Sequence, residues 1–556
     1  MRVAIVTDPW QLPAGDRIWG TGGWVSPEER EALDWLTLAR FLGWDVDVVD
    51  LASIGRLEAD AVIVATDELG EEGLGAIDEL LGRREILVIA RASPGAEETA
   101  LGTRMGAGDP RAGTDVAWTG PGPRMRWRTG SPLAYCPLQP PPGGSSWMEI
   151  DGKCVAAAAP TGKGTLVTLG FHPSAARDAG HGLTDAMRRM LTLGVAPPVA
   201  WLDLSGTVAL RMDDPGGAQN VYSRDWSYAK PGTTVYEDIA RILSRRNARI
   251  TVAYTAGWVD DGDAERGRLV VAGTDAERAP GAVHPSPVVR YEDLDGHLPG
   301  TVHNYEAEYR GIAALVEKSL AAVEIHGYTH VHPDARAWAV APDRYDSVEW
   351  FRELGPAAAE HLSSVTSVDH PVALAHAAIE RWFGSAPEVL VPPGDEWTNE
   401  SLERALDAGV DLVDSYYAAV RHGNRLAWTT HVCAPYLDEA SASWFESPLP
   451  LVGYLHDQDL AVHGTGWLEE GLAAWEAAGA TTFTDLRQLG RLARVRPTLS
   501  PGSGGIELSV PGPRLLSPAT VCFRTRGALP GSVVYEGRTL RVQPEGDAGR
   551  VTINPT

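Results

Sequence analysis

Cysteine is scarce in this chain of 556 residues. Only four are present, Cys136, Cys154, Cys433 and Cys522, and they are widely separated. No Cys-x-x-Cys pair occurs, which argues against a zinc site built from thiolates. Scattered cysteines of this kind also argue against a disulfide framework and are typical of a protein from a reducing compartment.

The sequence also lacks a long apolar run and an excess of positive charge. No window reaches the ~18 consecutive apolar residues that a membrane-spanning helix needs. The start, MRVAIVTDPW, has no basic segment before an apolar core, as a secretion signal would have. We therefore expect a cytoplasmic protein.

The formal net charge of −26 argues against nucleic acid or a membrane as partner, because both favour a basic face. The oligomeric state is not indicated.

The length predicts several domains, and we divide the chain into three. Residues 1–198 alternate apolar strands with helices, for example a strand at 3–7 and a helix at 27–42, which predicts an α/β accessory domain. The stretch 93–144 is rich in glycine and proline and is expected to be irregular loop. The end of this domain, 162–193, resembles that of a glutamine-amidotransferase-like fold, although the nucleophile elbow Gly-x-Cys-x-Gly is missing.

Residues 199–495 contain every side chain that suggests chemistry. Strands and helices alternate here too, as in strand 208–212 and helix 234–245, which predicts a (β/α) barrel or an open parallel sheet. The segment 260–306 is expected to be loop-like and to cover the site. The last part, 496–556, has short strands between glycine and proline turns, which predicts a small β-sandwich.

Two adjacent aspartates, Asp213 and Asp214, come directly after the apolar run Val208–Met212. The carboxyl ends of parallel strands are where such folds place their sites. Neighbouring residues of a strand point in different directions, so one carboxylate can bind a metal ion while the other reaches a bound water. A plain turn at a strand end is the structural alternative.

Histidines end two further strands of the same domain. His326 and His330 are four residues apart, and with one aspartate they can ligate a divalent ion and leave positions open for water and substrate. His456 ends the run Gly453-Tyr-Leu-His456, where an imidazole suits protonation of a leaving amine. For each histidine, ordinary packing in the core is the alternative.

These segments resemble the polysaccharide deacetylase family (NodB-homology, carbohydrate esterase family 4). The resemblance covers roughly half of the chain, and its specificity lies in the order of the motifs. Four motifs are matched in order, by Arg211-Met-Asp-Asp-Pro215, His326-Gly-Tyr-Thr-His330, Val391-Pro-Pro-Gly394 and Leu455-His456. The implied fold of the central domain is a deformed (β/α) barrel.

The resemblance also implies a role for each matched residue. Asp213 would be the catalytic base and His456 the general acid. Asp214, His326 and His330 would hold the metal, Zn²⁺ or another divalent cation such as Co²⁺, Ni²⁺ or Mn²⁺. The residues expected to bind substrate are Arg211, Pro393, Gly394, Trp397 and Leu455.

The chain departs from the family at two motifs. The arginine of the third motif is missing, since Leu390 and Val391 precede the two prolines. Arg211, two residues before Asp213, is a candidate replacement. The aspartate of the fourth motif is matched only by Asp411 or Asp414. The chain is therefore interpreted as a divergent member.

The predicted activity is metal-dependent hydrolysis of an amide. The resemblance implies removal of an N-acyl group, namely N-acetyl, and several of the 19 tryptophans lie near the motifs, which favours a carbohydrate ligand. With no secretion signal, an amino sugar or a glycosylated small metabolite fits better than a cell-wall polymer. Two alternatives stay open. One is other metal-dependent C–N bond chemistry, such as deformylation, lactam opening or cyclisation, and the other is a catalytically inactive carbohydrate-binding homologue.

Overall fold

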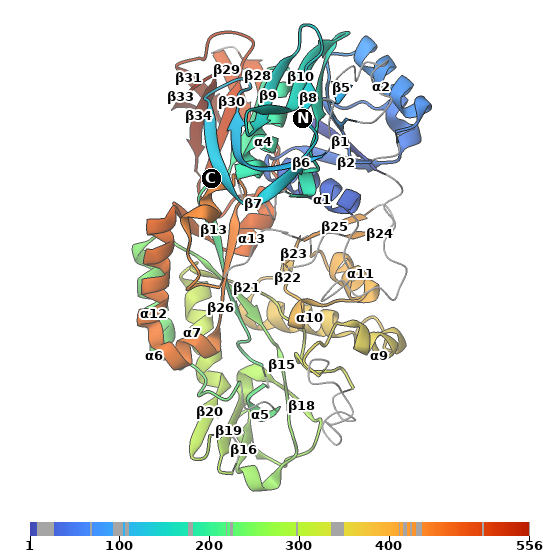
Figure 1. Ribbon diagram of the computed structural model, residues 1–556. Helices are drawn as coiled ribbons and strands as arrows, with labels where there is room; N and C mark the ends of the chain where they lie inside the picture. Colours follow the sequence, from blue (N-terminus) through green and yellow to red (C-terminus); the bar gives the residue numbers. More distant parts are fainter. Residues whose placement is uncertain are drawn as a thin grey trace.

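The protein is a mixed α/β structure, as the sequence predicts (Figure 1). The computed structural model describes residues 1–7, 27–66, 69–92, 104–105, 110–175, 182–217, 219–222, 226–295, 298–334, 350–410, 412–414, 420–422, 425–429, 436–502 and 505–554. In Figure 1 the first and last parts of the chain lie at the top, a parallel sheet with its helices in the middle, and a small β insert at the bottom. Within these residues, no helix has the length and apolar character needed to cross a bilayer.

The N-terminal part is built on a mixed nine-stranded sheet with the order β2-β1-β3-β4-β11-β10-β9-β6-β7. Its first five strands are parallel, and strands such as β3, Ala-Val-Ile-Val, are buried at every position because helices cover the sheet. The strands are β1 (Arg2–Val6), β2 (Asp45–Val49), β3 (Ala61–Val64), β4 (Leu87–Arg91), β6 (Arg111–Trp118), β7 (Met125–Tyr135), β9 (Ser145–Ile150), β10 (Lys153–Thr161) and β11 (Gly164–Leu169). The helices are α1 (Pro27–Phe41), α2 (Glu71–Arg83) and α4 (Gly182–Gly194).

The expectation of irregular loop at 93–144 is wrong for the part that the structure describes. β6 and β7 form an antiparallel ladder there, and β6 continues the sheet through β9. A bulge between Gly113 and Asp115 explains part of the error, because it interrupts the alternation that marks a strand. A short pair, β5 (Arg104–Met105) with β8 (Leu138–Gln139), lies beside this ladder. Cys136, Cys154 and Cys522 are not disulfide-bonded, and Cys433 lies outside the described residues.

The central part is a curled parallel sheet rather than a closed barrel in its described residues. Its order is β24-β25-β23-β22-β21-β14-β13-β26, with β27 also pairing with β13. The strands are β13 (Thr207–Asp213), β14 (Ile250–Tyr254), β21 (Ala321–Ile325), β22 (Val389–Leu390), β23 (Leu412–Val413), β24 (Val420–His422), β25 (Arg425–Thr429), β26 (Leu451–His456) and β27 (Thr482–Thr484). Only β24 runs antiparallel to its neighbour among these pairs, so the carboxyl ends of the other strands meet at one edge.

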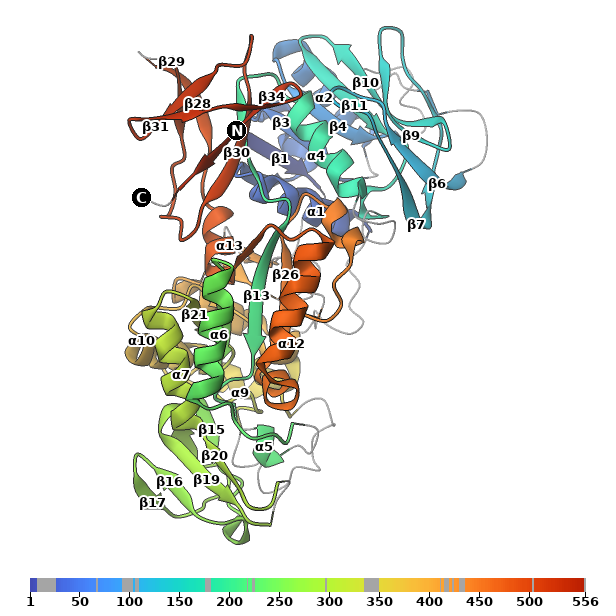
Figure 2. The same ribbon diagram turned by 90° about the vertical axis from the view of Figure 1, so that its left-hand side faces the viewer.

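Amphipathic helices cover this sheet. The predicted helix 234–245 is confirmed as α6, whose buried residues Tyr236, Ile239, Ala240 and Leu243 have the spacing of one helix face. Figure 2 shows α6, α7 and α12 on one side of the sheet, while α9, α10 and α11 lie on the other side in Figure 1. The bounds are α5 (Gln219–Tyr222), α6 (Thr233–Arg245), α7 (Tyr305–Glu317), α9 (Ala359–Ser364), α10 (Pro371–Phe383), α11 (Asn399–Asp407) and α12 (Asp457–Ala478).

The segment 260–306, expected to be loop-like, is largely a small β insert. Its strands are β15 (Gly257–Val259), β16 (Leu269–Val271), β17 (Thr274–Ala276), β18 (Val283–Pro285), β19 (Val289–Asp293) and β20 (Thr301–Asn304). The insert has its own core, in which Trp258, Tyr291 and Tyr305 are fully buried. Because these strands are only three to five residues long, their periodicity gives little signal.

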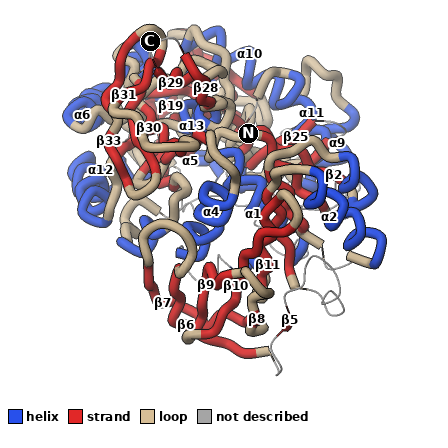
Figure 3. The backbone as a smooth tube through the Cα atoms, turned by 90° about the horizontal axis from the view of Figure 1, so that it is seen from above, coloured by secondary structure: helices blue, strands red, loops and turns tan. Residues whose placement is uncertain are grey.

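The C-terminal part forms two four-stranded sheets. One has the order β28-β29-β31-β32, and the other, β12-β30-β34-β33, takes in β12 (Val199–Asp203), which comes directly after the first predicted domain. Seen from above (Figure 3), the C-terminal strands and β6–β11 lie on different sides of α1 and α4. The remaining bounds are β28 (Thr498–Gly502), β29 (Gly505–Ser509), β30 (Ala519–Arg524), β31 (Ser532–Tyr535), β32 (Arg538–Arg541), β33 (Gln543–Glu545) and β34 (Ala548–Ile553).

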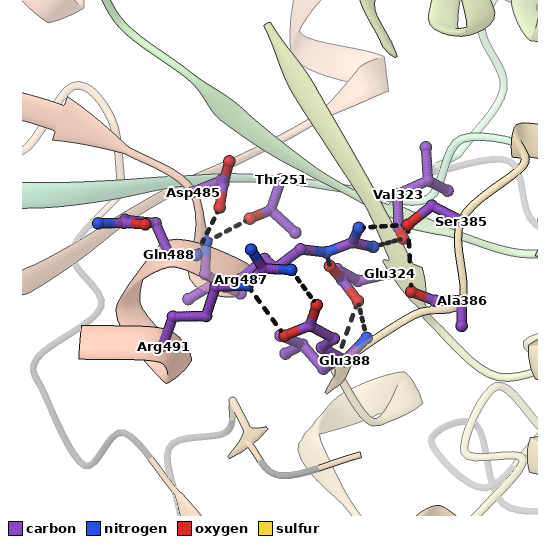
Figure 4. Close-up of polar contacts among 12 residues, drawn as sticks. Thr251, Val323, Glu324, Ser385, Ala386, Glu388, Asp485, Arg487, Gln488 and Arg491 are labelled. Carbon is purple, nitrogen blue, oxygen red and sulfur yellow. Dashed lines mark hydrogen bonds and ion pairs between the residues drawn. The ribbon is translucent and has the colours of Figure 1, made fainter. Parts of the chain in front are cut away.

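Helix α13 (Leu486–Leu492) joins the parallel sheet to the C-terminal strands through buried polar contacts (Figure 4). Arg487 donates to the Glu324 carboxylate on β21 at 2.6 Å, and Gln488 accepts the Leu516 N–H at 2.6 Å. Asp485 caps the helix by accepting the Gln488 N–H at 2.7 Å. These contacts connect the parallel sheet to the C-terminal strands.

Helix α10 has a histidine N-cap that should make stability depend on pH. The His370 Nδ1 accepts the Val372 N–H at 3.3 Å, and burial, assisted by Arg404, lowers the pKa of His370 to about 4. A folded-state pKa below the unfolded value of about 6.5 means that stability is complete above pH 6.5 and is lost as pH falls through 4. His370→Asn keeps a capping side chain that does not titrate. From urea titrations, we expect its free energy of unfolding to change less between pH 7 and pH 4 than that of the wild type, by roughly 1–3 kcal/mol.

The acid comparison is made in the presence of a chelator, so that protonation of any metal ligand affects both proteins equally. His303, whose pKa burial also lowers to about 4, is present in both and cancels from the difference. Equal acid sensitivity of the two proteins would show that the His370 cap does not govern the transition.

Candidate metal and catalytic site

The predicted site residues meet at the carboxyl edge of three strands. Asp213 ends β13 and stands opposite His456, which ends the neighbouring strand β26, in the same register position. His326 comes directly after β21, two strands away on the other side. In Figure 1 this edge faces the β15–β20 insert. Residues that are far apart in the sequence are therefore brought to one place by the parallel sheet.

Asp214, His326 and His330 form a buried cluster. The Asp214 Oδ1 lies 3.3 Å from the Nε2 of His326 and 3.3 Å from the Nε2 of His330. One donor atom from each of the three side chains lies within 4.8 Å of the other two. Asp214 and His330 both have a positive φ, 76° and 60°, a strained conformation that is concentrated at functional sites. This donor set, one carboxylate and two imidazoles, fits a divalent ion.

Hydrogen bonding prepares His326 for this role. Its Nδ1 lies 2.8 Å from the Val391 carbonyl oxygen, which can only accept, so Nδ1 carries the hydrogen. The Nε2 is therefore the ring nitrogen that faces Asp214, as in histidine ligands whose second nitrogen donates to a carbonyl. Burial lowers the pKa of His330 to about 4 despite the attraction of Asp214, which keeps that ring neutral, as a ligand must be.

A carboxylate that no sequence motif indicates holds the loop between the two histidines. Glu353 accepts the N–H groups of Tyr328, Thr329 and His330 at 2.7, 2.9 and 3.2 Å, and the Thr329 hydroxyl at 2.7 Å. A Cβ at Gly327, where φ is 70°, would lie 2.2 Å from the Glu353 Oε2, so only glycine fits. Glu353 lies far along the chain from every motif, and no spacing predicts its role.

Arg211 clamps Asp213. Its Nε donates to the Asp213 Oδ1 at 2.8 Å, and its Nη2 bonds the other carboxylate oxygen, which gives a bidentate pair. The Arg211 Nη1 also donates to the Asp414 Oδ2 at 3.1 Å, and Asp395 lies 3.9 Å from Nη2. Residues two apart on a strand share a face, which explains how Arg211 reaches Asp213. Arg211 thus holds the carboxylate of the predicted base, and its replacement of the missing third-motif arginine stays a prediction.

The contact with the Arg211 guanidinium also determines the charge of Asp213. Burial acts to raise the pKa of Asp213, but the Arg211 guanidinium outweighs it and holds that pKa below its ordinary value. Asp213 is therefore an ionised carboxylate at neutral pH. Asp414 contacts Arg211, and Asp411, the other candidate for the fourth motif, lies outside the described residues.

His456 is half-buried and has two polar neighbours. The Tyr436 Oη lies 2.9 Å from the His456 Nδ1, and the same hydroxyl donates to the Asp459 Oδ2 at 2.6 Å. The indole of Trp226 meets the imidazole edge-on, with ring centroids 5.4 Å apart. Neither Tyr436 nor Asp459 belongs to a motif recognised in the sequence.

A second network of buried polar side chains lies next to the ends of β13 and β26. The Lys230 ammonium, which has no exposed surface, pairs with Asp457 and lies 3.3 Å from Glu308. Glu308 accepts the Gly216 N–H at 2.8 Å, just after the aspartates, and Asp457 comes directly after His456. Tyr228 donates to Asp457 at 2.6 Å. These bonds fix the β13 and β26 strand ends relative to each other.

The remaining predicted residues lie nearby or in the core. Pro393 is buried next to Gly327, and Gly394 has a φ of 62° in the adjoining turn. Leu455 and Trp397 are 0% and 3% exposed and belong to the hydrophobic core of the parallel sheet. Contact of these four residues with a substrate stays a prediction.

The chain has only distant similarity to known proteins. No family model and no curated protein matches it. Similar solved structures include a putative polysaccharide deacetylase from Mycobacterium smegmatis, 12% identical over 53% of this chain and 92% of that chain, with a TM-score of 0.30. A CE4 family pseudoenzyme from Bacillus anthracis is 10% identical over 51% of this chain and 66% of that chain, with a TM-score of 0.25.

The amidotransferase-like resemblance of the N-terminal part stays a prediction. Another of the similar solved structures is the exo-beta-1,4-mannosidase Op5Man5 from Opitutaceae bacterium strain TAV5, 13% identical over 34% of this chain, with a TM-score of 0.24. The match spans only 33% of the length of that mannosidase. TM-scores this far below 0.5 do not establish a shared fold, so a function for this protein has to be inferred from its own side chains.

Proposed function

We propose that this protein is a metal-dependent amide hydrolase that removes an N-acyl group, namely N-acetyl, from an amino sugar or a glycosylated small metabolite. The observation that carries the proposal is the cluster of Asp214, His326 and His330, with a second ionised carboxylate, Asp213, and an imidazole, His456, at the same sheet edge. A structural cluster would need neither the strained backbone at two ligands nor two further proton-transfer groups beside it.

Each side chain has a defined task in this proposal. Asp214, His326 and His330 would hold a divalent cation, Zn²⁺ or a similar ion, which when bound supplies a Lewis acid for an amide carbonyl and lowers the pKa of a water. Asp213, kept ionised by Arg211, accepts a proton from that water. His456 donates a proton to the departing nitrogen. The water oxygen would add to the carbonyl carbon and the C–N bond would break, so the base acts on the attacking water and the acid, from the adjacent strand, acts on the leaving nitrogen.

Aromatic side chains on two sides of the site favour a sugar-like substrate. Trp226 lies beside His456, and Phe351 lies beside His330, with ring centroids 6.3 Å apart. Both aromatic residues are partly exposed. Flat aromatic rings at a polar site suit a ligand with apolar ring faces and polar edges, as a pyranose has.

Metal content and product release test the proposal together. We expect the purified wild type, loaded with Zn²⁺ and dialysed, to retain about one ion per chain and to release acetate from at least one N-acetylated amino sugar in a screen. Metal with release of a different product would favour other C–N bond chemistry. Absence of both metal and release would favour an inactive binding protein.

Asp214→Ala should abolish metal retention, because it removes the only carboxylate among the three predicted ligands and leaves two imidazoles. The matched control is Asp275→Ala, which removes an exposed carboxylate of the β insert and should retain the ion. Retention of stoichiometric metal by Asp214→Ala, measured by elemental analysis, would show that the ligand set is wrong.

A further inference from the structure

Tyr436 stands between His456 and the nearest carboxylate. The Asp459 Oδ2 lies 3.9 Å from the His456 Nδ1, which is too far for a hydrogen bond. The Tyr436 Oη bridges this gap, at 2.6 Å from the Asp459 Oδ2 and 2.9 Å from the His456 Nδ1. The Asp459 Oδ2 also accepts the His456 backbone N–H at 2.7 Å, so the carboxylate is anchored to the same residue.

The number of hydrogens in this chain of bonds determines the tautomer. A phenol has one hydrogen, and an ionised carboxylate can only accept. The Tyr436 hydrogen therefore lies toward Asp459, and the phenol oxygen presents a lone pair to His456. The His456 Nδ1 must then carry a hydrogen and donate it to Tyr436. As a result, Nε2 is the ring nitrogen at which a proton is gained or released.

The arrangement also fixes the orientation of the imidazole. Trp226 packs edge-on against the ring, Tyr454 approaches it at 5.8 Å between centroids, and Tyr436 holds one corner. Asp457, the next residue, is held by Lys230 and Tyr228. With one nitrogen bonded to Tyr436 and two aromatic rings packed against the imidazole, little rotation is left.

We infer that Tyr436 and Asp459 are positioning residues, which hold the imidazole of His456 in the Nδ1–H tautomer with Nε2 available for proton transfer. The role of the transferred proton depends on the proposed amide hydrolysis. The tautomer itself does not, because it results from the bonds among these three side chains.

The tautomer can be read directly by nuclear magnetic resonance. Full-length protein labelled with ¹⁵N only in histidine is compared with His456→Gln, which identifies the His456 signals. In the wild type we expect a protonated Nδ1. In Tyr436→Phe, which removes the acceptor for that hydrogen, and in Asp459→Asn, which removes the charge that orients the phenol, we expect a shift toward the Nε2–H tautomer. An unchanged tautomer in both variants would overturn the inference.

Once a substrate is known, enzyme kinetics provide a second test of the positioning role of Tyr436. Tyr436→Phe should lower kcat by about 100-fold, as a misplaced catalytic group does, with KM within about twofold and metal content unchanged. The matched control, Tyr309→Phe, removes a hydroxyl that donates to the Trp382 carbonyl far from His456 and should keep the wild-type kcat. If no amide substrate is found, the tautomer result still stands, so the two proposals can fail separately. Equal kcat values for the two variants would contradict the positioning role.

Discussion

Replacing Asp213 by asparagine should lower kcat by about 10²–10⁴-fold while the metal content stays that of the wild type. The amide has the size of the carboxylate but cannot accept the proton of an attacking water at neutral pH. The three ligand side chains do not include Asp213, so the ion should remain bound. Elemental analysis and product release, measured on the same preparation, separate the two effects.

The matched control for this variant is Asp414→Asn. Asp414 is the other carboxylate bonded to Arg211, and its loss changes the charge around the guanidinium without removing the predicted base. We expect Asp414→Asn to reduce kcat by about tenfold or less, since the bidentate pair with Asp213 remains. A near wild-type rate for Asp213→Asn with bound metal would show that the base is another group.

Much of the site can be predicted because its residues stand at the ends of apolar runs. The five predicted metal and catalytic residues, Asp213, Asp214, His326, His330 and His456, lie at or just after the ends of three strands of one parallel sheet. Where such strands are recognised, the sheet itself brings their carboxyl ends together. For four of the five residues the signal therefore comes from position along the strand, whereas His330 is indicated by its spacing of four residues from His326.

The supporting residues cannot be predicted in the same way. Glu353, Tyr436 and Asp459 act through contacts that no repeat or strand period encodes, and each resembles an ordinary surface or core residue in the sequence. Arg211 is a candidate in the sequence only by its spacing from Asp213. Its contacts to Asp414 and Asp395 depend on how the later strand and turn pack against β13.

Short or interrupted strands account for the errors in the predicted fold. A bulge and the nearby glycines hide the alternation of β6 and β7, and the strands of the β15–β20 insert are too short to show a period. Long amphipathic elements such as α6 are predicted within one residue, since their apolar face repeats over several turns.

Arg211→Met should cost about 3–5 kcal/mol of stability and nearly all activity, whereas Arg211→Lys should fold and retain metal but lose about 10–100-fold in kcat. The guanidinium is buried and is a cation shared by three carboxylates, Asp213, Asp395 and Asp414. Methionine removes this positive charge from all three. Lysine restores one charge but cannot make the bidentate bonds that orient Asp213.

The pKa of Asp395 provides an independent measurement on the Arg211 variants. Burial raises the pKa of Asp395 to about 6, although Arg211 acts against this. With methionine at position 211 that opposition disappears, so Asp395 should take up a proton at higher pH than in the wild type. Infrared absorption of protonated carboxyl groups, compared between Arg211→Met and wild type at pH 7, would detect the change.

A partly buried ion pair of an arginine with an aspartate, away from the site, serves as the control. Arg249 donates to the Asp485 carboxylate at 2.5 Å, at the opposite end of the strands from the site. Arg249→Lys should reduce stability modestly and leave kcat within about twofold, because lysine cannot bond both the Asp485 carboxylate and the Ser319 carbonyl as arginine does, while Asp213 is not affected. If Arg211→Lys and Arg249→Lys had equal kcat values, the clamp on Asp213 would have no catalytic consequence. Arg211 would then serve only as a charge partner for the carboxylates around it.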